Sequence, residues 1–534
     1  MIKILVALKI PTLVLLCTLF AASSHGKGVS ADAKTITASL AGEPPTLDSS
    51  LTEDSESNFI LSQIKEGLVR TDSRGKIAPG VAERWETHAQ GATFYLNPNA
   101  KWSDGKPVTA YDFEFAWKRT VTPATGASGS TFMYFVLDNA AEIIAGEKPV
   151  TTLGVRAINA TTLEVTTSHY VPYIVEALSS ISFLPQRQDI VERFGDTYAA
   201  EAKHQVFNGP FMLEEWVHGA KLSLTKNPHY WNQSDITLRG IDFGYITSDK
   251  RALFNLYQSE ELATLKIDNT IVQEVADAGV RLRKRPSHCY RQLTLNLRPE
   301  RPTGNLSLRK AMLNAFDVET YVNRVIAMPG TIKLTSLYGD SIMNLKGQKF
   351  NEAFISPFSK ITKDQVESDL AQAKRELGEL PTLVLLSREG NEKQDEYVQA
   401  LLKRELNLDV QIDRQSFKQA IEKLIGGDFD IAFSGFCNGT LTDPYITATA
   451  YKSTNPFNDG KFSSQLYDQL LEQTKSVTNP AERMKIFARL EQLLFEAAAI
   501  IPTHQESDLY IHDNRLRKIS YGPSKDFSRG LIRN

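Results

Sequence analysis

The stretch from Leu380 to Arg414 constrains the fold most, because its hydrophobic pattern changes from strand to helix and back to strand. Residues 380–390, "LPTLVLLSREG", form an apolar run that ends in a turn signal. Residues 396–407, "EYVQALLKRELN", carry apolar residues at helical spacing, and residues 408–414, "LDVQIDR", alternate like a strand. A strand–helix–strand unit of this kind pairs its two strands in parallel. The sequence therefore predicts an α/β domain in this part of the chain.

The next two elements place a cysteine at the end of a strand. Residues 417–427, "FKQAIEKLIGG", predict a helix that two glycines terminate, and residues 428–436, "DFDIAFSGF", predict a strand. Cys437 follows directly. Ligands of open α/β sheets bind beyond the carboxyl ends of the strands. We therefore expect a ligand site around Cys437.

The first residues predict export. Lys3 and Lys9 precede an apolar run over 10–22, and small residues follow at 21–24. This pattern is typical of a secretory signal peptide, with cleavage near Ser24. The alternative is an uncleaved anchor, but the run is shorter than the roughly 20 apolar residues that span a bilayer.

Composition and cysteine number narrow the class of protein further. The chain has 534 residues, which predicts several domains, and a formal net charge of −3. With no basic run, nucleic acid is not an expected partner. Cys17 lies within the signal, so Cys289 and Cys437 remain in an oxidising compartment. Their number and location predict a disulfide, with two separately buried thiols as the alternative.

Residues 102–119, "WSDGKPVTAYDFEFAWKR", predict a turn followed by an aromatic-rich helix. Thr109 is the expected N-cap, and Asp112 stands at the third helical position of a capping box. Aromatic residues at helical spacing usually face a core, so we expect this helix to be structural.

Catalytic and metal-binding patterns are missing from the sequence. It contains no G-x-S-x-G, H-E-x-x-H, Walker or G-x-G-x-x-G motif, and its nine histidines show no ligand spacing. We therefore expect a binding protein that is not an enzyme and that needs no cofactor and no metal.

Several stretches, in order along the chain, resemble one family. "PPTLDSS", "GKIAPGVAERWE" and "LSLRKAMLNAFDVETYV" support the resemblance, and "WSDGKPVTAYDF" and "FNGPF…NPHYW" are specific to it. The chain resembles the periplasmic oligopeptide-binding proteins, the solute-binding components of ABC importers for peptides. The resemblance implies an α/β periplasmic binding protein fold, with two lobes around a hinged cleft and an extra third domain.

The resemblance also implies boundaries. After the signal peptide (1–24), lobe I comprises 25–60, 186–285 and 505–534, domain II comprises 61–185, and lobe III comprises 286–504. Cys289 and Cys437 match two positions that form a disulfide in many members of the family.

The charges that hold peptide ends in the family are largely missing here. The family's aspartate two residues after the second cysteine corresponds to Gly439, or to Asn438 or Thr440 if the gap is placed differently. Two family arginines before that cysteine correspond to Phe433 and Leu424. Asp443 remains in the turn and is the expected partner for a ligand ammonium. End-blocked peptides should therefore suit this chain better than zwitterionic ones.

The expected ligand contacts come from two backbone segments and from pocket-lining side chains. Phe417 and Phe436 have core packing as an alternative role. The full set is Leu51, Thr52, Glu53, Asp54, Phe417, Phe433, Ser434, Gly435, Phe436, Cys437, Gly439, Asp443 and Asn458.

The expected function is a monomeric periplasmic protein that encloses peptides between its lobes and delivers them to the permease and ATPase of an ABC importer. One alternative is the same fold binding a modified peptide, a sugar conjugate or a metal chelate. The other is an exported hydrolase.

Overall fold

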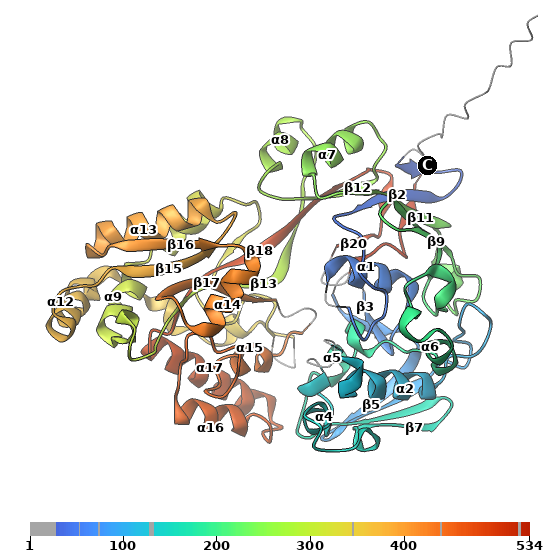
Figure 1. Cartoon of the computed structure of the whole chain (residues 1–534), viewed down its shortest axis with the longest axis horizontal. Helices are drawn as coiled ribbons and strands as arrows, with labels where there is room; N and C mark the ends of the chain where they lie inside the picture. The colour runs from blue at the N-terminus through green and yellow to red at the C-terminus, as the bar shows by residue number, and fades with distance from the viewer. Residues whose placement is uncertain are drawn as a thin grey trace, which may run out of the picture.

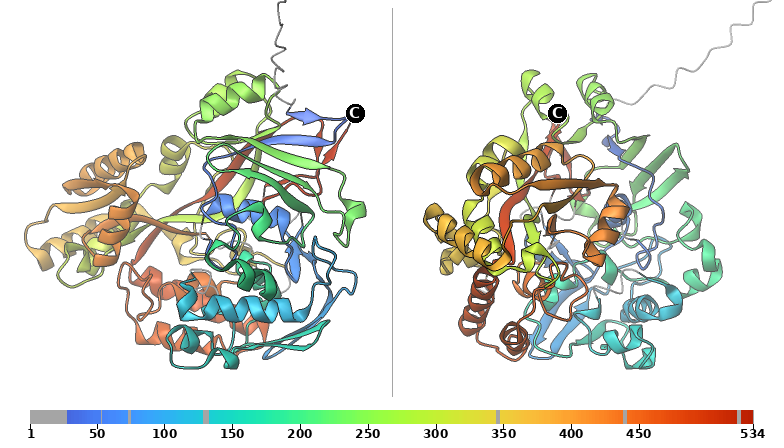
Figure 2. Two further views of the ribbon diagram at one scale, coloured as in Figure 1. Left: turned by 45° about the vertical axis from the view of Figure 1, so that its right-hand side comes forward. Right: turned by 60° about the vertical axis from the view of Figure 1, so that its left-hand side comes forward.

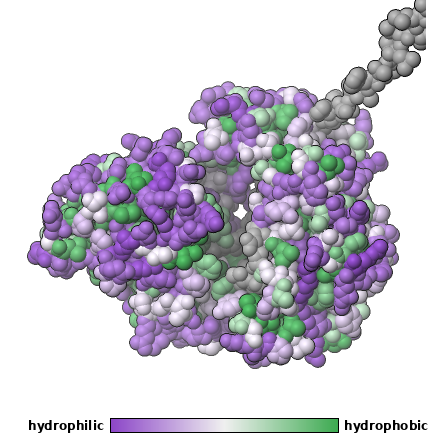
Figure 3. All heavy atoms as spheres, viewed as in Figure 1, coloured by the Kyte–Doolittle hydropathy of each residue, from purple (hydrophilic) through white to green (hydrophobic). Residues whose placement is uncertain are grey.

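The computed structural model describes residues 28–52, 54–72, 75–127, 133–343, 347–437, 441–521 and 525–533. Helices and sheets alternate along the chain, and they form two halves with a hollow between them (Figures 1 and 3). The predicted signal peptide and the predicted ligand residues Glu53 and Gly439 lie outside the described residues.

Half A, on the right in Figure 1, is built on two sheets. The first has the strand order β1 (Val29–Ser30), β2 (Thr35–Leu40), β11 (Gly240–Ile246), β10 (Lys221–Lys226) and β9 (Phe211–Val217). Helix α1 (Ser55–Ile64) packs on this sheet. Its Phe59 ring lies edge-on to the Phe243 ring of β11, with centroids 5.6 Å apart.

The second sheet of half A has the strand order β5 (Ala82–His88), β6 (Gly91–Leu96), β8 (Thr162–Thr166) and β7 (Val155–Asn159). Helix α2 (Ala110–Val121) packs against it and begins at the predicted N-cap. The Asp112 carboxylate accepts a hydrogen bond of 2.8 Å from the Thr109 backbone N–H. Phe113 and Trp117 are fully buried. The predicted structural role of this helix is therefore confirmed.

The sheet β12-β18-β13-β17-β15-β16 fills half B, on the left in Figure 1, and its β12 edge reaches half A beside β2. Its strands are β12 (Thr264–Ile267), β18 (Ile500–His512), β13 (Arg283–Leu295), β17 (Ile431–Cys437), β15 (Leu383–Arg388) and β16 (Val410–Gln415), and β14 (Ile332–Lys333) pairs with β18. Strand β15 is parallel to β16, and helix α13 (Glu392–Leu406) connects them, which confirms the predicted unit. Helix α14 (Phe417–Gly426) ends at Gly427 with φ of 79°, a conformation that favours glycine.

Strands β13 and β18 run between the two halves (Figures 1 and 2). Both have 13 residues and pair antiparallel, with β12 beside β18 at one end and β17 beside β13 at the other. Their register shifts between Pro286 and Tyr290, where residues 287–289 oppose a single residue of β18. We call residues 287–289 the bulge.

Further elements complete both halves. The helices are α4 (Ala140–Ile144), α5 (Ile174–Ala177), α6 (Gln188–Phe194), α7 (Lys250–Gln258), α8 (Val272–Asp277), α9 (Leu306–Ala315), α10 (Val318–Thr320), α11 (Phe350–Ala353), α12 (Val366–Leu377), α15 (Tyr445–Thr449), α16 (Gln465–Gln473) and α17 (Pro480–Glu496). The short strands are β3 (Val69–Thr71), β4 (Ile77–Pro79), β19 (Leu516–Arg517), β20 (Ser520–Tyr521), β21 (Lys525–Asp526) and β22 (Leu531–Ile532). Within the described ranges, no helix has both the length and the apolar character needed to cross a bilayer.

Candidate functional site

The end of β17 is fixed to β13 by a disulfide. Cys289 and Cys437 face each other in the antiparallel pair and are bonded, with Cα atoms 4.0 Å apart and a sequence separation of 148. The predicted bridge is therefore confirmed.

Beyond its first two residues, β17 has one open edge. Its pairing with β15 consists of Leu385 with Ile431 and Leu386 with Ala432, whereas its pairing with β13 continues to Cys437. The two parallel strands thus separate after Ala432. The backbone groups of residues 433–437 that point away from β13 are left for another partner.

Arg388 is the last residue of β15 and lies where β15 and β17 separate. Its guanidinium carbon lies 5.5 Å from the centre of the Phe417 ring. Burial, together with the nearby positive charge of Arg291, lowers the pKa of Arg388. Arg291 is paired with Glu506, at 2.6 Å between Nε and Oε1. In the described part of the chain, no hydrogen bond or ion pair forms on the Arg388 guanidinium.

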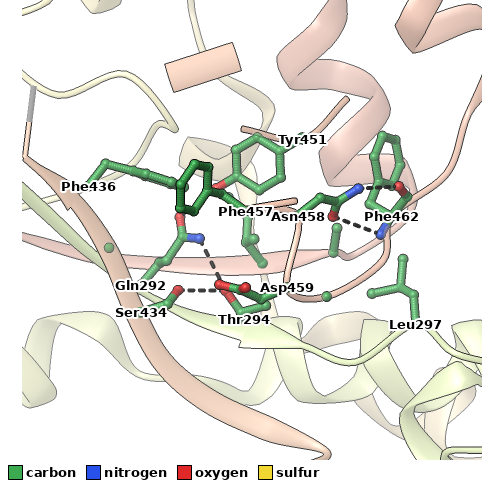
Figure 4. Close-up of a pocket in the computed structure, with 14 residues that line it drawn as sticks. Gln292, Thr294, Leu297, Ser434, Phe436, Tyr451, Phe457, Asn458, Asp459 and Phe462 are labelled. Atoms are coloured by element: carbon green, nitrogen blue, oxygen red, sulfur yellow. Dashed lines mark hydrogen bonds between the residues drawn. The ribbon is translucent and has the colours of Figure 1, made fainter. Parts of the chain in front are cut away.

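A pocket lies over β13 and β17 on one face of the sheet (Figure 4). It has a volume of about 380 Å³, part of which is open to solvent. We call it the Asp459 pocket. It is lined by Gln292, Thr294, Leu297, Ser434, Gly435, Phe436, Tyr451, Phe457, Asn458, Asp459, Gly460, Phe462, Ala499 and Ile500.

A hydrogen-bonded network of neutral groups forms the floor of the pocket (Figure 4). The hydroxyls of Thr294 and Ser434 are 2.6 Å apart, and Gln292 Nε2 donates to Thr294 Oγ1 at 3.3 Å. The Tyr451 hydroxyl donates to Gln292 Oε1 at 2.9 Å. These groups satisfy one another, so the floor is a rigid polar surface.

Asp459 is the acidic residue of the pocket lining. Burial raises the pKa of Asp459 to about 6, against the opposing effects of Lys461 and Arg298. The Arg298 guanidinium donates to the backbone carbonyl of Asp459 at 3.1 Å and to Asn296 Oδ1 at 2.9 Å. Among the described residues, no group forms a hydrogen bond or an ion pair with the Asp459 carboxylate.

The structure corrects the expectation for Asp443. Its carboxylate is buried and accepts two hydrogen bonds from the Arg483 guanidinium, at 2.5 and 3.0 Å. It also accepts from the Tyr445 backbone N–H at 2.9 Å. Both carboxylate oxygens are therefore used inside the protein, and Asp443 is not available for a ligand ammonium.

Asn458 lines the pocket, but its amide holds a loop together. Its Nδ2 donates to the carbonyls of Phe462 (2.7 Å) and Lys452 (3.2 Å), and its Oδ1 accepts from the Phe462 N–H. The predicted pocket-lining position of Asn458 agrees with the structure, and its role as a ligand contact remains a prediction.

Aromatic residues and glycine shape the rest of the predicted site. Phe436 lies edge-on to Tyr451, and Phe433 is partly buried against the core. Phe417 is 66% exposed, which excludes the alternative of core packing. A Cβ at Gly435 would lie 2.1 Å from the Tyr290 carbonyl oxygen, so the backbone here admits only glycine.

The other predicted segment lies in half A, before α1. Leu51 is partly exposed and Thr52 is buried. Asp54 caps α1, because its Oδ1 accepts from the N–H groups of Glu56 and Ser57 at 2.9 and 2.8 Å. A ligand role for this segment remains a prediction.

The two halves also meet beside the end of β17. The Glu176 carboxylate of α5 accepts from the Thr442 backbone N–H at 3.2 Å and from its hydroxyl at 3.1 Å. The rings of Tyr173 and Tyr445 stack with centroids 6.3 Å apart. The open edge of β17 thus lies close to a direct contact between the halves.

Sequence reasoning missed Arg388, Asp459, Gln292 and Thr294 as members of this region. A charged residue that ends a predicted parallel strand was a usable signal for Arg388. Nothing local distinguished Asp459, which sits in an ordinary turn, "FNDG". Within the described residues, no three His, Cys, Asp or Glu side chains gather into a metal-binding group.

Comparisons with known proteins agree with this architecture. The family model described as "Bacterial extracellular solute-binding proteins, family 5 Middle" matches residues 76–458. The periplasmic oligopeptide-binding protein OppA of Salmonella typhimurium is 28% identical over 515 residues, covering 94% of this chain and 93% of that protein.

Two solved structures are similar over nearly the whole chain. The substrate-binding domain of an oligopeptide ABC transporter from Bacillus anthracis has a TM-score of 0.76 at 27% identity, covering 95% of this chain and 100% of that one. Haemophilus influenzae OppA in complex with the peptide RPPGFSPFR has a TM-score of 0.75 at 25% identity, covering 93% and 99%.

Proposed function

We propose that this chain, which belongs to family 5 of the bacterial extracellular solute-binding proteins, captures peptides between its two halves and delivers them to an ABC importer. The observation that carries the proposal is the open edge of β17 from Phe433 to Cys437. An extended peptide adds to such an edge through main-chain hydrogen bonds, which do not depend on its sequence. The peptide-bound Haemophilus relative and the ABC transporter relative support the ligand class and the partner.

Arg388 supplies a charged anchor for one end of the ligand. Its guanidinium has no hydrogen-bonding partner among the described residues, and it lies where β15 leaves β17. A guanidinium binds a carboxylate through two parallel hydrogen bonds. We assign the free carboxylate of the peptide to this position, and we do not assign the ammonium to Asp443 because Arg483 occupies that carboxylate.

Closure of the halves completes the binding mechanism. Strands β13 and β18 connect half A to half B, and they are the elements about which the halves rotate. The predicted limits of lobe I, domain II and lobe III place both crossings near 285 and 505, close to the bulge. The protein binds and releases its ligand unchanged and catalyses no reaction.

The cellular setting follows from the same proposal. Residues 1–24 direct export and are removed, and the mature protein acts in the periplasm as a monomer. Its partners there are the permease and the ATPase of an importer, and the periplasmic relative supports this location.

The direct test is the ligand that the protein carries. The exported protein is purified natively from periplasm and denatured, and the released compounds are identified by mass spectrometry. Peptides at a ratio near one per chain are expected. Calorimetry on the ligand-free protein should then show saturable binding of tri- to pentapeptides, which are recovered intact. A non-peptide solute, or cleavage of the peptides, would overturn the proposal.

A further inference from the structure

The Asp459 pocket contains one carboxylate for which the proposed binding of the peptide backbone gives no role. The carboxylate of Asp459 borders a cavity whose other lining residues are neutral (Figure 4). Arg298 and Lys461 act on its charge, but among the described residues neither forms an ion pair with it: Arg298 donates to a backbone carbonyl and to Asn296, and Lys461 is exposed. A partly buried carboxylate without a donor is costly, and a cation that enters the pocket removes that cost.

The walls of the pocket suit the stem of a long cationic side chain. Phe436, Tyr451, Phe457 and Phe462 contribute aromatic rings. Such surfaces pack against methylene groups, and their faces attract an ammonium or guanidinium. The empty space of about 380 Å³ includes open solvent, so the enclosed part of the pocket is small and suits one side chain and not a whole ligand.

The pocket is placed correctly for a peptide on the open edge of β17. Ser434 and Phe436 belong to that edge and also line the pocket. Alternate side chains of an added strand project to the same face of the sheet. One side chain of the ligand is thus directed toward the pocket while the backbone follows β17.

We propose that the Asp459 pocket receives a lysine or arginine side chain of the bound peptide, with Asp459 as its counter-ion and as the residue that sets this preference. The inference rests on the proposed function, because the register along β17 delivers the side chain. The preference concerns one ligand side chain and is separate from the anchoring of the ligand ends.

The test compares matched peptides by calorimetry on the full mature protein. Three tripeptides carry lysine at the first, second or third position among alanines, and three partners carry norleucine, which lacks only the ammonium. For one position, lysine should bind about tenfold to a hundredfold more tightly than norleucine. Asp459→Asn should abolish this difference and leave norleucine binding within about threefold of the native protein. Asp459→Glu should retain part of it.

Asp409→Asn is the matched control, because it removes the same charge from a side chain that is 67% exposed and paired with Lys403. It should leave the lysine preference unchanged. If norleucine peptides bind but lysine gives no advantage at any position, or if the advantage survives in Asp459→Asn, the inference is wrong while the proposed function stands. If no peptide binds, both are wrong.

Discussion

The Asp443 carboxylate and the Arg483 guanidinium form a two-pronged ion pair, in which the two side chains are 3% and 1% exposed. Arg483 also donates from Nε to the Thr474 carbonyl at 3.2 Å. The pair thereby joins the turn after β17 to the start of α17.

Asp443→Asn should therefore destabilise the protein and leave its ligand contacts intact. Removing one charge of a buried pair leaves the other uncompensated, which costs about 3–5 kcal/mol. Urea unfolding with circular dichroism would measure the loss, and calorimetry below the transition should show peptide affinity within about threefold of the native protein. Unchanged stability with lost binding would instead identify Asp443 as a ligand contact.

The disulfide should be fully formed in the exported protein and should contribute strongly to its stability. Non-reducing peptide mapping is expected to find Cys289 linked to Cys437. The bond closes a loop of 148 residues, for which the chain-entropy model gives on the order of 5 kcal/mol as an upper figure. The double variant Cys289→Ser with Cys437→Ser should unfold at lower urea concentration. Two free thiols after native purification would contradict this prediction.

Arg388 should distinguish a free carboxyl terminus from a blocked one. Peptides with a free carboxylate are expected to bind about tenfold more tightly than their amides, because a charged hydrogen bond contributes about 1.5–3 kcal/mol. Arg388→Gln should weaken the free peptides and leave the amides nearly unchanged, as calorimetry would show. The surface variant Arg404→Gln, whose side chain is 63% exposed, serves as control. Equal losses for free peptides and amides in Arg388→Gln would exclude the anchor role.

Binding of a lysine peptide should weaken as the pH falls through about 6. Burial raises the pKa of Asp459 to about 6, so the carboxylate is charged above this value and protonated below it. Arg298, Lys461 and the Tyr451 hydroxyl are the other charged or titratable groups that interact with it. Calorimetry from pH 5 to 8 should give a sloping affinity for the lysine peptide and a flat one for its norleucine partner. A slope that persists in Asp459→Asn would assign the effect to another group.

Ligand binding should bring the two halves together. Small-angle scattering of the ligand-free and peptide-saturated protein is expected to show a smaller radius of gyration with ligand, because rotation about β13 and β18 narrows the hollow. Addition of a peptide that does not bind should leave the radius unchanged. The same radius with a saturating ligand would contradict closure.

The sequence predicted those elements whose signals are local. The unit around α13 follows from a change of hydrophobic period, and α2 follows from Thr109 and Asp112 at capping-box spacing. Cys289 and Cys437 could be paired because few cysteines were available in an oxidising compartment.

What the sequence did not predict depends on residues far apart in the chain. Asp443 looked free because its partner Arg483 lies 40 residues away. Asp459 acquires its surroundings only when the loop from Tyr451 to Phe462 covers β13 and β17. Arg388 gains its position because β15 and β17 separate after two residue pairs, which no local pattern reports.

The position of the disulfide has a mechanical consequence. Cys289 is the last residue of the bulge, where the ladder between β13 and β18 is interrupted. Pro286 comes directly before the bulge and has no N–H to donate. The covalent link joins β17 to residues 289–295 of β13, with which it pairs. The bulge lies directly beside this linked pair of strands. If the halves rotate about the bulge, as we propose, the disulfide-linked pair of strands that carries the open edge moves as one unit.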